Sequence, residues 1–162
     1  MPEIRVGQGF DIHPFSDDPH RRLMLGGVAF DGPGLVGHSD ADAVVHAVID
    51  ALLGASGLGD IGQRYPDTDP MHAGADSMAM LADTVAAVLA EGWEVANVDC
   101  TVVLEAPRLA QRRDEMQDAL SAVVGAQVSV KGRRAEGLGA LGRREGVACF
   151  AVALLQRDGR QA

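Results

Sequence analysis

The chain has 162 residues, a formal net charge of −9 at pH 7, 47% hydrophobic residues and only 4% aromatic ones. This length suits one domain with its own core, so we expect a single domain over residues 1–162. The negative charge argues against nucleic acid or an anionic membrane surface as a partner, because nothing in the overall field attracts a polyanion. An anionic substrate must therefore be held by local cations.

The two cysteines and the hydropathy indicate where the protein resides. Cys100 and Cys149 lie far apart in apolar segments without a C-x-x-C pair, which is typical of buried thiols in a reducing compartment. The sequence has no signal-peptide pattern and no apolar run of membrane-spanning length. We therefore expect a cytoplasmic protein.

The N-terminal segment combines a strand pattern with two polar side chains. Residues 3–10 read as a first strand that leads into Asp11-Ile12-His13-Pro14. Because successive side chains of a strand alternate between its faces, Asp11 and His13 share one face. Residues 22–30 read as a second strand, and a turn over 31–34 returns the chain to a histidine and a serine.

A helix is predicted to follow, with Ser39 as its N-cap and Gly54 as the residue that ends it. Asp42, His46 and Asp50 recur at intervals of four residues, so they are expected to share one face of this helix. Valine, isoleucine and leucine cover most of the remaining circumference, which predicts that the polar stripe faces a site.

Asp11, His13 and His46 together suggest a metal site. Three protein ligands of the O and N type leave one tetrahedral position open, as in catalytic zinc sites. For the isolated D-x-x-x-H-x-x-x-D pattern, a solvated surface histidine is the commoner outcome, and the upstream Asp-x-His favours the metal. His20 and His72 lie in polar, turn-like surroundings and are expected to be surface histidines.

The rest of the chain alternates between helices and strands. We expect an acidic, flexible lid over residues 65–70 and a loop over 131–146. Helices are expected over 76–91 and 109–124, and strands over 93–106, 127–131 and 147–155. This order predicts an α+β fold with a mixed β-sheet and its helices on one face. The uncovered face favours oligomerisation.

The loop before the last strand carries two further motifs. Gly137, Gly139 and Gly142 match G-x-G-x-x-G, but a dinucleotide fingerprint opens a helix and here a strand is expected. The same loop is rich in cations, which either form a solvated turn or bind phosphate, and we prefer phosphate binding. These cations are Lys131, Arg133, Arg134, Arg143 and Arg144.

Six segments, in order along nearly the whole chain, resemble the 2-C-methyl-D-erythritol 2,4-cyclodiphosphate synthases of the non-mevalonate isoprenoid pathway. They are GFDIHPF, HSDADAVVHAVIDALLGASGLGDIG, YPDTDP, GADS, EAPR and GRREGVA. The resemblance implies a homotrimer with active sites at subunit interfaces, each holding Zn²⁺ and a second divalent ion, Mg²⁺ or Mn²⁺. The implied reaction converts 4-diphosphocytidyl-2-C-methyl-D-erythritol 2-phosphate into the cyclic diphosphate and releases CMP.

The resemblance also implies roles for individual residues. Asp11, His13 and His46 would hold zinc and Glu136 the second metal, while His38, Asp60 and Arg134 would be catalytic. Arg108 stands where the family usually has lysine. The full set of expected substrate contacts is Asp11, His13, His38, Ser39, Asp60, Ile61, Gly62, Tyr65, Asp67, Asp69, Leu104, Ala106, Pro107, Arg108, Leu109, Ala110, Arg133, Arg134, Glu136 and Arg143.

The chain departs from the family pattern before the metal-binding glutamate, where Arg133 and Arg134 replace threonines. Arginine can replace a hydroxyl as a phosphate donor, although its charge competes with a metal. Phe150 and Ala140 also depart from the pattern near the trimer axis. Two alternatives therefore stay open: a catalytically weakened zinc- and cytidine-nucleotide-binding homologue, and a zinc-dependent hydrolase of a related phosphate ester.

Overall fold

The computed structural model describes residues 1–159, so the last three residues of the domain expected over 1–162 lie outside the described part. The strands are β1 (Glu3–Pro14), β2 (Leu23–Leu25), β3 (Val28–Phe30), β4 (Glu94–Val103), β5 (Gln127–Arg133) and β6 (Gly146–Arg157). The helices are α1 (Ala43–Ser56), α2 (Ile61–Arg64), α3 (Ser77–Ala90), α4 (Arg113–Val124) and α5 (Gly139–Gly142), with 3-10 turns η1 (Pro70–His72) and η2 (Leu109–Gln111).

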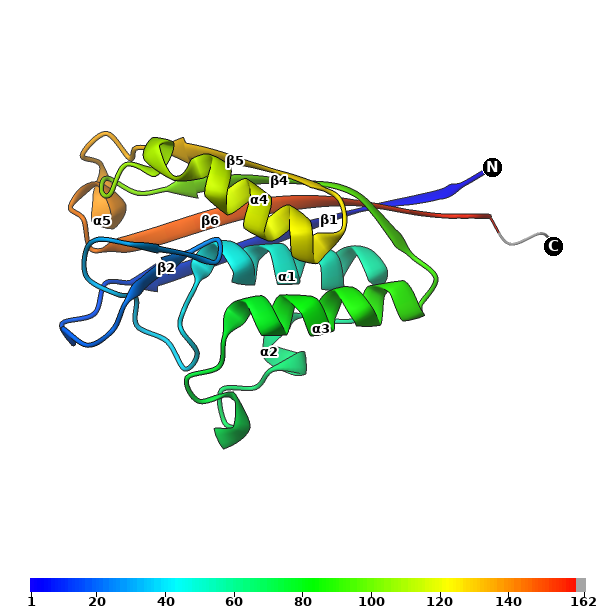
Figure 1. The fold of residues 1–162 in the computed structure, drawn as a ribbon, viewed down its shortest axis with the longest axis horizontal. Coiled ribbons are helices and arrows are strands. Elements are labelled where there is room, and N and C mark those ends of the chain that lie inside the picture. Colours follow the sequence, from blue (N-terminus) through cyan, green and yellow to red (C-terminus); the bar gives the residue numbers. More distant parts are fainter. Residues whose placement is uncertain (160–162) are drawn as a thin grey trace.

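Four strands form a mixed sheet in the order β1-β6-β4-β5. β6 is antiparallel to both β1 and β4, whereas β5 is parallel to β4. Helices α1, α3 and α4 lie on the same side of this sheet (Figure 1). The α+β fold with helices on one face is therefore confirmed.

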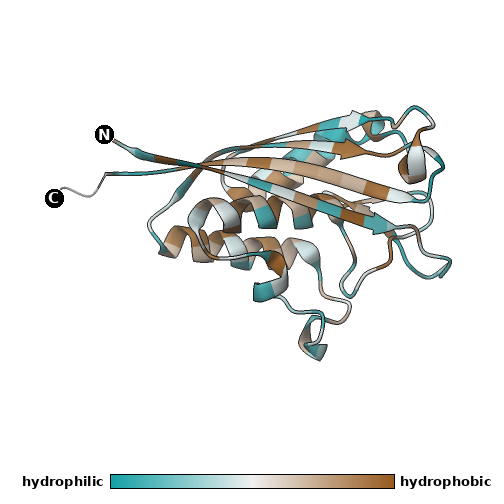
Figure 2. Ribbon diagram, turned by 180° about the vertical axis from the view of Figure 1, so that it is seen from behind, coloured by the Kyte–Doolittle hydropathy of each residue, from teal (hydrophilic) through white to brown (hydrophobic). Residues whose placement is uncertain are grey.

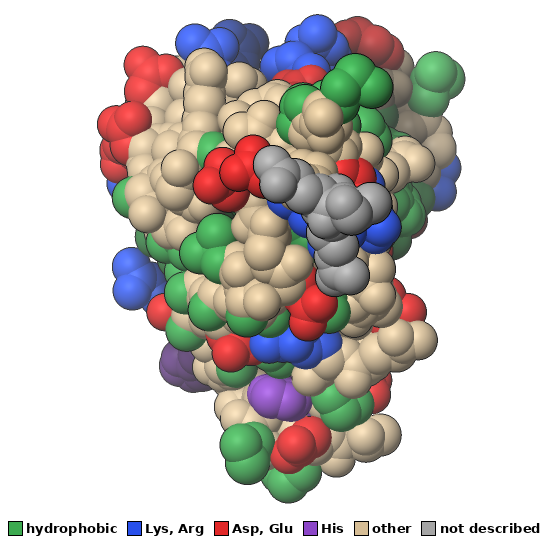
Figure 3. All heavy atoms as spheres, turned by 90° about the vertical axis from the view of Figure 1, so that its right-hand side faces the viewer, with side chains coloured by type: hydrophobic (Ala, Val, Ile, Leu, Met, Phe, Trp, Pro, Cys, Tyr) green, Lys and Arg blue, Asp and Glu red, His purple; other side chains and the backbone are tan. Residues whose placement is uncertain are grey.

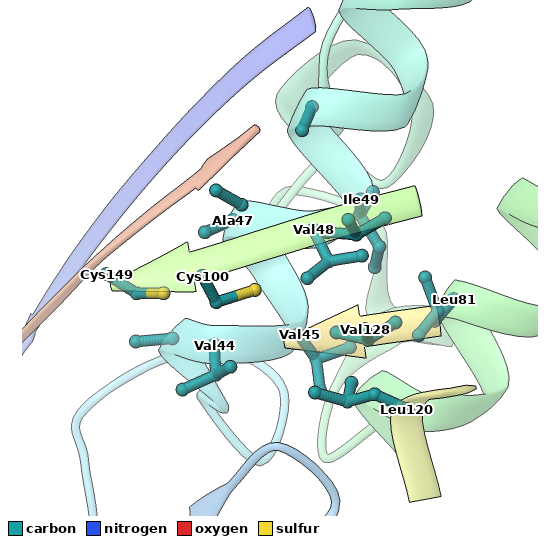
Figure 4. Packing of buried hydrophobic residues seen from close by; sticks show 14 of the residues in the cluster. Val44, Val45, Ala47, Val48, Ile49, Leu81, Cys100, Leu120, Val128 and Cys149 are labelled. Atoms are coloured by element: carbon teal, nitrogen blue, oxygen red, sulfur yellow. The ribbon is translucent and has the colours of Figure 1, made fainter. Parts of the chain in front are cut away.

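Two glycines of β1 bring α1 unusually close to the sheet. A Cβ atom added at Gly9 would lie 1.9 Å from the carbonyl oxygen of Ala47, and one added at Gly7 would lie 2.0 Å from that of Ala51. Figure 4 shows the resulting core beside this contact, where α1 packs against the buried Cys100 of β4. The backbone of α1 therefore rests directly on β1, which brings the helix side chains to the polar end of that strand.

The opposite side of the sheet carries exposed apolar side chains, and Figure 2 shows hydrophobic segments along the strands seen from this side. Phe10 of β1 and Phe150 of β6 pack together there with ring centroids 4.8 Å apart. We call this surface the apolar sheet face; it comprises Ile4, Val6, Phe10, Ile12, Phe150 and Val152. Soluble monomers seldom leave such a contiguous patch uncovered.

Several predicted boundaries were wrong for local reasons. The strand expected over 22–30 is a hairpin of β2 and β3, because Gly26 and Gly27 adopt positive φ angles of 61° and 75° and turn the chain. Ser39 is not the N-cap of α1, and Gly54 does not end it. Asp42 caps the helix, which continues to a left-handed residue at position 57 with a φ of 78°.

The loop expected over 131–146 contains the one-turn helix α5, and β5 extends into it to Arg133. Gly142 packs so closely on Gly137 that an added Cβ would lie 2.2 Å from its carbonyl carbon. The glycines therefore fold a compact turn before β6, consistent with the prediction that they are no dinucleotide fingerprint.

The surface shows no single dominant charge at the end of the molecule where β1 begins and β6 ends (Figure 3). Figure 3 shows acidic and basic side chains interspersed there. Within residues 1–159, none of the helices combines the length and apolar character needed to cross a bilayer.

Candidate active site

Three ligand-type atoms converge where β1 meets α1. Asp11 Oδ2 lies 2.9 Å from His13 Nε2 and 3.1 Å from His46 Nδ1, and the two ring nitrogens are 3.3 Å apart. The strand alternation places Asp11 and His13 on the side that faces the helix. The predicted grouping of these three residues is thus confirmed, and it fits a divalent metal ion.

The hydrogen bond on the far side of His13 fixes which ring nitrogen can bind a metal. His13 Nδ1 lies 2.6 Å from the carbonyl oxygen of Val36, which can only accept a hydrogen bond. Nδ1 therefore carries the proton in the neutral ring, and the Nε2 lone pair faces Asp11. A carbonyl in this position is the usual outer partner of a metal-binding histidine.

Asp11 and His13 shift each other's pKa. Burial raises the pKa of Asp11, but the hydrogen bonds and positive charge that His13 and His46 supply when their rings are protonated outweigh it and lower that pKa to about 2. Burial lowers the pKa of His13, yet the hydrogen bond and charge of Asp11 outweigh it and raise the pKa above its ordinary value. A cation entering this group therefore competes with a proton on His13.

The other two members of the predicted polar stripe, Asp42 and Asp50, do not reach Asp11, His13 and His46, which we call the metal group. Asp42 is buried at the start of α1, where its carboxylate accepts hydrogen bonds from Gly26 and Gly27 at 2.8 Å and from the first turn of the helix. Asp50 accepts a hydrogen bond from the backbone N–H of Ile61 at 3.0 Å. The prediction that both carboxylates flank His46 in a site was wrong, because α1 begins after Asp42 and Asp50 supports α2 instead.

A cavity of about 420 Å³ opens in front of the three ligand-type residues. It is lined by Asp11, His13, Gly37, His38, Ser39, His46, Ile61, Gly62, Tyr65, Asp67, His72 and Met80. Most of the expected contacts near the metal thus share one cavity. Asp60 and Asp69 lie outside this lining and act as caps, accepting from the backbone N–H groups of Gln63 at 2.8 Å and Met71 at 2.9 Å.

Three lining residues, Gly37, His72 and Met80, were missed by sequence reasoning. His72 was expected to be a surface histidine like His20, but His72 is half-buried whereas His20 is exposed. The ring of His72 packs edge-on against Tyr65, with centroids 5.5 Å apart. Met80 comes from α3, a helix whose apolar pattern indicated core packing alone. The one local signal for His72 is its place three residues after Asp69, one turn along the acidic loop.

The acidic segment after α2 forms one wall of this cavity and is attached at both ends. The hydroxyl group of Tyr65 lies 2.7 Å from Asp83 Oδ2 and 2.9 Å from Thr84 Oγ1, both on α3. At the other end, His38 Nε2 lies 3.1 Å from the carbonyl oxygen of Asp69. The role of residues 65–70 as a flexible lid remains a prediction.

A second cavity, of about 240 Å³, lies at the ends of β4 and β5. It is lined by Leu104, Glu105, Pro107, Arg108, Leu109, Ala110, Arg113, Gly132, Arg133 and Arg134. The segment expected to hold cytidine and the two arginines that replace threonines therefore meet. Ala106 does not line the cavity, and the exposed Glu136 and Arg143 line neither cavity of the described chain.

Most of the cations expected to bind phosphate pair with carboxylates in the described chain. Arg134 donates to Glu105 through Nε at 2.9 Å and lies 2.8 Å from it through Nη2, and this pairing lowers the pKa of the carboxyl group. Arg143 pairs with Glu145 at 2.6 Å, and Lys131 pairs with Asp99. Within residues 1–159, the Arg133 side chain makes a hydrogen bond only to the neighbouring carbonyl of Gly132, at 3.0 Å.

The chain is similar to a known protein family and to known proteins over nearly its whole length. Residues 4–156 match the model of the YgbB family. A 2-C-methyl-D-erythritol 2,4-cyclodiphosphate synthase from Azoarcus sp. (strain BH72) is 51% identical over 158 residues, which cover 95% of this chain and 96% of the relative.

Some relatives are longer, and solved structures share the fold. The bifunctional enzyme IspD/IspF of Anaeromyxobacter dehalogenans is 49% identical across 95% of this chain, which spans only 40% of that relative. The structure of IspF from Plasmodium falciparum in a CDP complex is 32% identical, with a TM-score of 0.83, over 96% of this chain and 97% of that one.

Proposed function

This chain belongs to the YgbB family, and we propose that it catalyses the metal-dependent cyclisation of 4-diphosphocytidyl-2-C-methyl-D-erythritol 2-phosphate to 2-C-methyl-D-erythritol 2,4-cyclodiphosphate, with release of CMP. The observation that carries the proposal is the convergence of Asp11 Oδ2, His13 Nε2 and His46 Nδ1 in the wall of an open cavity. Relatives that bear the synthase name span nearly the whole chain.

In this reaction an oxygen of the 2-phosphate attacks the β-phosphorus of the diphosphate, and the bond from that phosphorus to the CMP oxygen breaks. Zn²⁺ bound by Asp11, His13 and His46 would draw charge from a phosphate oxygen as a Lewis acid. His38 and Ser39 line the same cavity and orient the phosphate through hydrogen bonds, which supplies alignment. Ile61 and Gly62 contact the carbon skeleton.

The second cavity would hold the cytidine diphosphate part. Arg108 and the backbone around it border the base and ribose, while Arg133 and Arg134 lie close enough to the cavity to neutralise phosphate charge. Glu136 would hold the second divalent ion, Mg²⁺ or Mn²⁺, which would neutralise phosphate charge when bound. Glu105 limits the freedom of Arg134, so Arg133 is the readier phosphate donor.

We also propose that the protein works as a homotrimer with each active site shared between two subunits. The apolar sheet face needs a cover, and three copies around an axis provide one. The two cavities have no lining residue in common, so a substrate spanning them within one chain lacks a continuous surface. A neighbouring subunit can supply the second half of the site.

The test is an assay of CMP release with identification of the second product, using the parent and His46→Ala. The parent should give CMP and the cyclic diphosphate. His46→Ala should lose metal and activity while keeping its fold, because the apolar side of α1 is unchanged. A linear phosphate product would identify a hydrolase, and zinc binding without CMP release would identify a nucleotide-binding homologue.

A further inference from the structure

The ring nitrogen of His46 that points away from the metal group contacts two hydroxyl groups. His46 Nε2 lies 2.9 Å from Ser77 Oγ, at the start of α3, and 3.1 Å from Ser39 Oγ, in the loop before α1. All three side chains are buried. Ser77 Oγ in turn makes a hydrogen bond to Asp40 Oδ1, so a buried chain of contacts runs from the metal group to a carboxylate.

The direction of these hydrogen bonds follows from what each group can donate. The Asp40 carboxylate can only accept, so the single hydroxyl proton of Ser77 points to it. Ser77 Oγ can then only accept from His46, which requires a proton on Nε2. In the neutral ring, this leaves the lone pair on His46 Nδ1, the atom 3.1 Å from Asp11 Oδ2.

The same arrangement frees the hydroxyl proton of Ser39. The oxygen of Ser39 accepts a hydrogen bond from the backbone N–H of Ala41 at 3.1 Å. Because Nε2 of His46 carries its own proton, it does not need the proton of Ser39. Ser39 lines the cavity of about 420 Å³ in front of the metal group and can therefore donate to an anionic group bound there.

We propose that Asp40 and Ser77 are positioning residues that hold His46 in the Nε2–H tautomer, which both exposes Nδ1 to the metal and leaves the Ser39 hydroxyl free to donate to a substrate phosphate. The phosphate part rests on the proposed function. A carboxylate or hydroxyl behind a metal-binding histidine is a known way to fix its tautomer and increase its affinity for metal.

Asp40 is itself held firmly enough for this role. Its Oδ1 accepts from the backbone N–H of Asp42, and its Oδ2 accepts from that of Ser77, both at 3.2 Å. Its own backbone N–H donates to the carbonyl oxygen of Ala75 at 3.0 Å. Asp40 therefore joins the first residues of α1 and α3, and the orientation of His46 depends on both helix starts.

The test compares Ser77→Ala, Asp40→Asn and the double variant, with Ser56→Ala as the matched control. Ser56 is a buried serine on α1 whose hydroxyl binds only carbonyl groups of its own helix, at 2.8 and 3.1 Å. Zinc affinity is measured by competition with a chromophoric chelator. Each single variant should bind zinc about 10–100-fold more weakly than the parent, whereas Ser56→Ala should match the parent.

Two further readouts separate a positioning role from general destabilisation. The double variant should lose no more affinity than the weaker-binding single variant, because both substitutions act through one histidine. The ¹⁵N shifts of the His46 ring in the metal-free parent, at about pH 8, should report Nε2–H. In Asp40→Asn the side-chain amide can donate to Ser77, so the ring should move toward Nδ1–H.

The proposal is overturned if the metal-free parent carries its proton on Nδ1, a result that needs no variant to fold. It is also overturned if Ser77→Ala and Asp40→Asn bind zinc like the parent, or if their losses add in the double variant. In those cases His46→Ala would still lose zinc if the proposed function is correct, so the two failures can be told apart.

Discussion

At the scale of single residues, the protonation of His13 beside Asp11 should control zinc binding. The pKa of Asp11 is lowered to about 2, so this carboxylate is ionised over the whole neutral range. The pKa of His13 is raised above its ordinary value, so near neutral pH zinc must displace a proton there. Zinc affinity should therefore increase up to about tenfold per pH unit below the raised pKa and level off above it. A zinc titration series across pH measures this, and an affinity that is constant from about pH 5.5 to 8 would contradict it.

The stability of the metal-free protein should also depend on pH. The raised pKa of His13 contributes stability that is fully present below the pKa of the unfolded state and is lost as the pH increases through the folded-state value. The lowered pKa of Asp11 contributes stability above its unfolded value, lost as the pH decreases toward about 2. Urea unfolding of the apoprotein across this range tests both directions.

The family resemblance alone does not predict whether Arg133 and Arg134 have taken over phosphate binding from the threonines that they replace. If they replace the threonines as phosphate donors, changing both to Ala should slow CMP release by roughly tenfold or more per contact, since a shielded charge-assisted hydrogen bond contributes about 1.5–3 kcal/mol. Changing both to Thr should restore activity at least in part. Arg22→Ala is the control, because it removes an exposed cation that lines neither cavity. A double Ala variant as fast as the parent would show that the arginines are solvated.

At the scale of elements, the contact between β1 and α1 sets the geometry of the metal group. Gly9→Ala should destabilise the fold by about 1–3 kcal/mol or more and weaken zinc binding, because the new methyl group would displace the helix that carries His46. Gly54→Ala is the control within α1, where an added Cβ meets nothing within 4 Å; it should stabilise by about 0.5–1 kcal/mol. Equal melting temperatures for the two variants would contradict this account.

The sequence predicted those elements whose pattern is local. The apolar spacing of α3 and the apolar runs of β4 and β6 indicated helix and strands within a few residues of their observed bounds. The metal group followed from two short-range rules, strand alternation for Asp11 and His13 and the placement of His46 on a helix. Most residues of the second cavity followed from the family resemblance rather than from periodicity, whereas Glu105, Arg113 and Gly132 were not among the expected contacts.

What the sequence did not predict depends on contacts between distant segments. Asp42 looked like a site residue because its spacing from His46 fits a helix face. Its carboxylate instead caps α1 and also accepts hydrogen bonds from the distant Gly26 and Gly27. His72 and Met80 reach the cavity only because the Tyr65 hydroxyl group attaches the acidic segment to α3. No periodicity within either segment encodes that contact.

At the scale of the whole molecule, the proposed trimer would link the apolar sheet face to catalysis. Val152 lies near the middle of this face, on the central strand β6, and is 44% exposed in the single chain. Val152→Glu would bury one unpaired carboxylate per subunit in the proposed trimer, which is strongly unfavourable. We therefore expect the parent to be a trimer by light scattering and the variant to be monomeric at micromolar concentration.

Val152→Glu should affect zinc affinity and CMP release differently. Zinc affinity should persist, because Asp11, His13 and His46 belong to one chain. CMP release should be lost, because each site needs a cavity from a second subunit. Leu89→Glu is the matched control, since Leu89 is an exposed apolar residue of α3 away from the sheet, and it should leave both mass and activity unchanged. A monomeric Val152→Glu variant with full activity would show that one chain carries a complete site, and a monomeric parent would remove the trimer from the proposal.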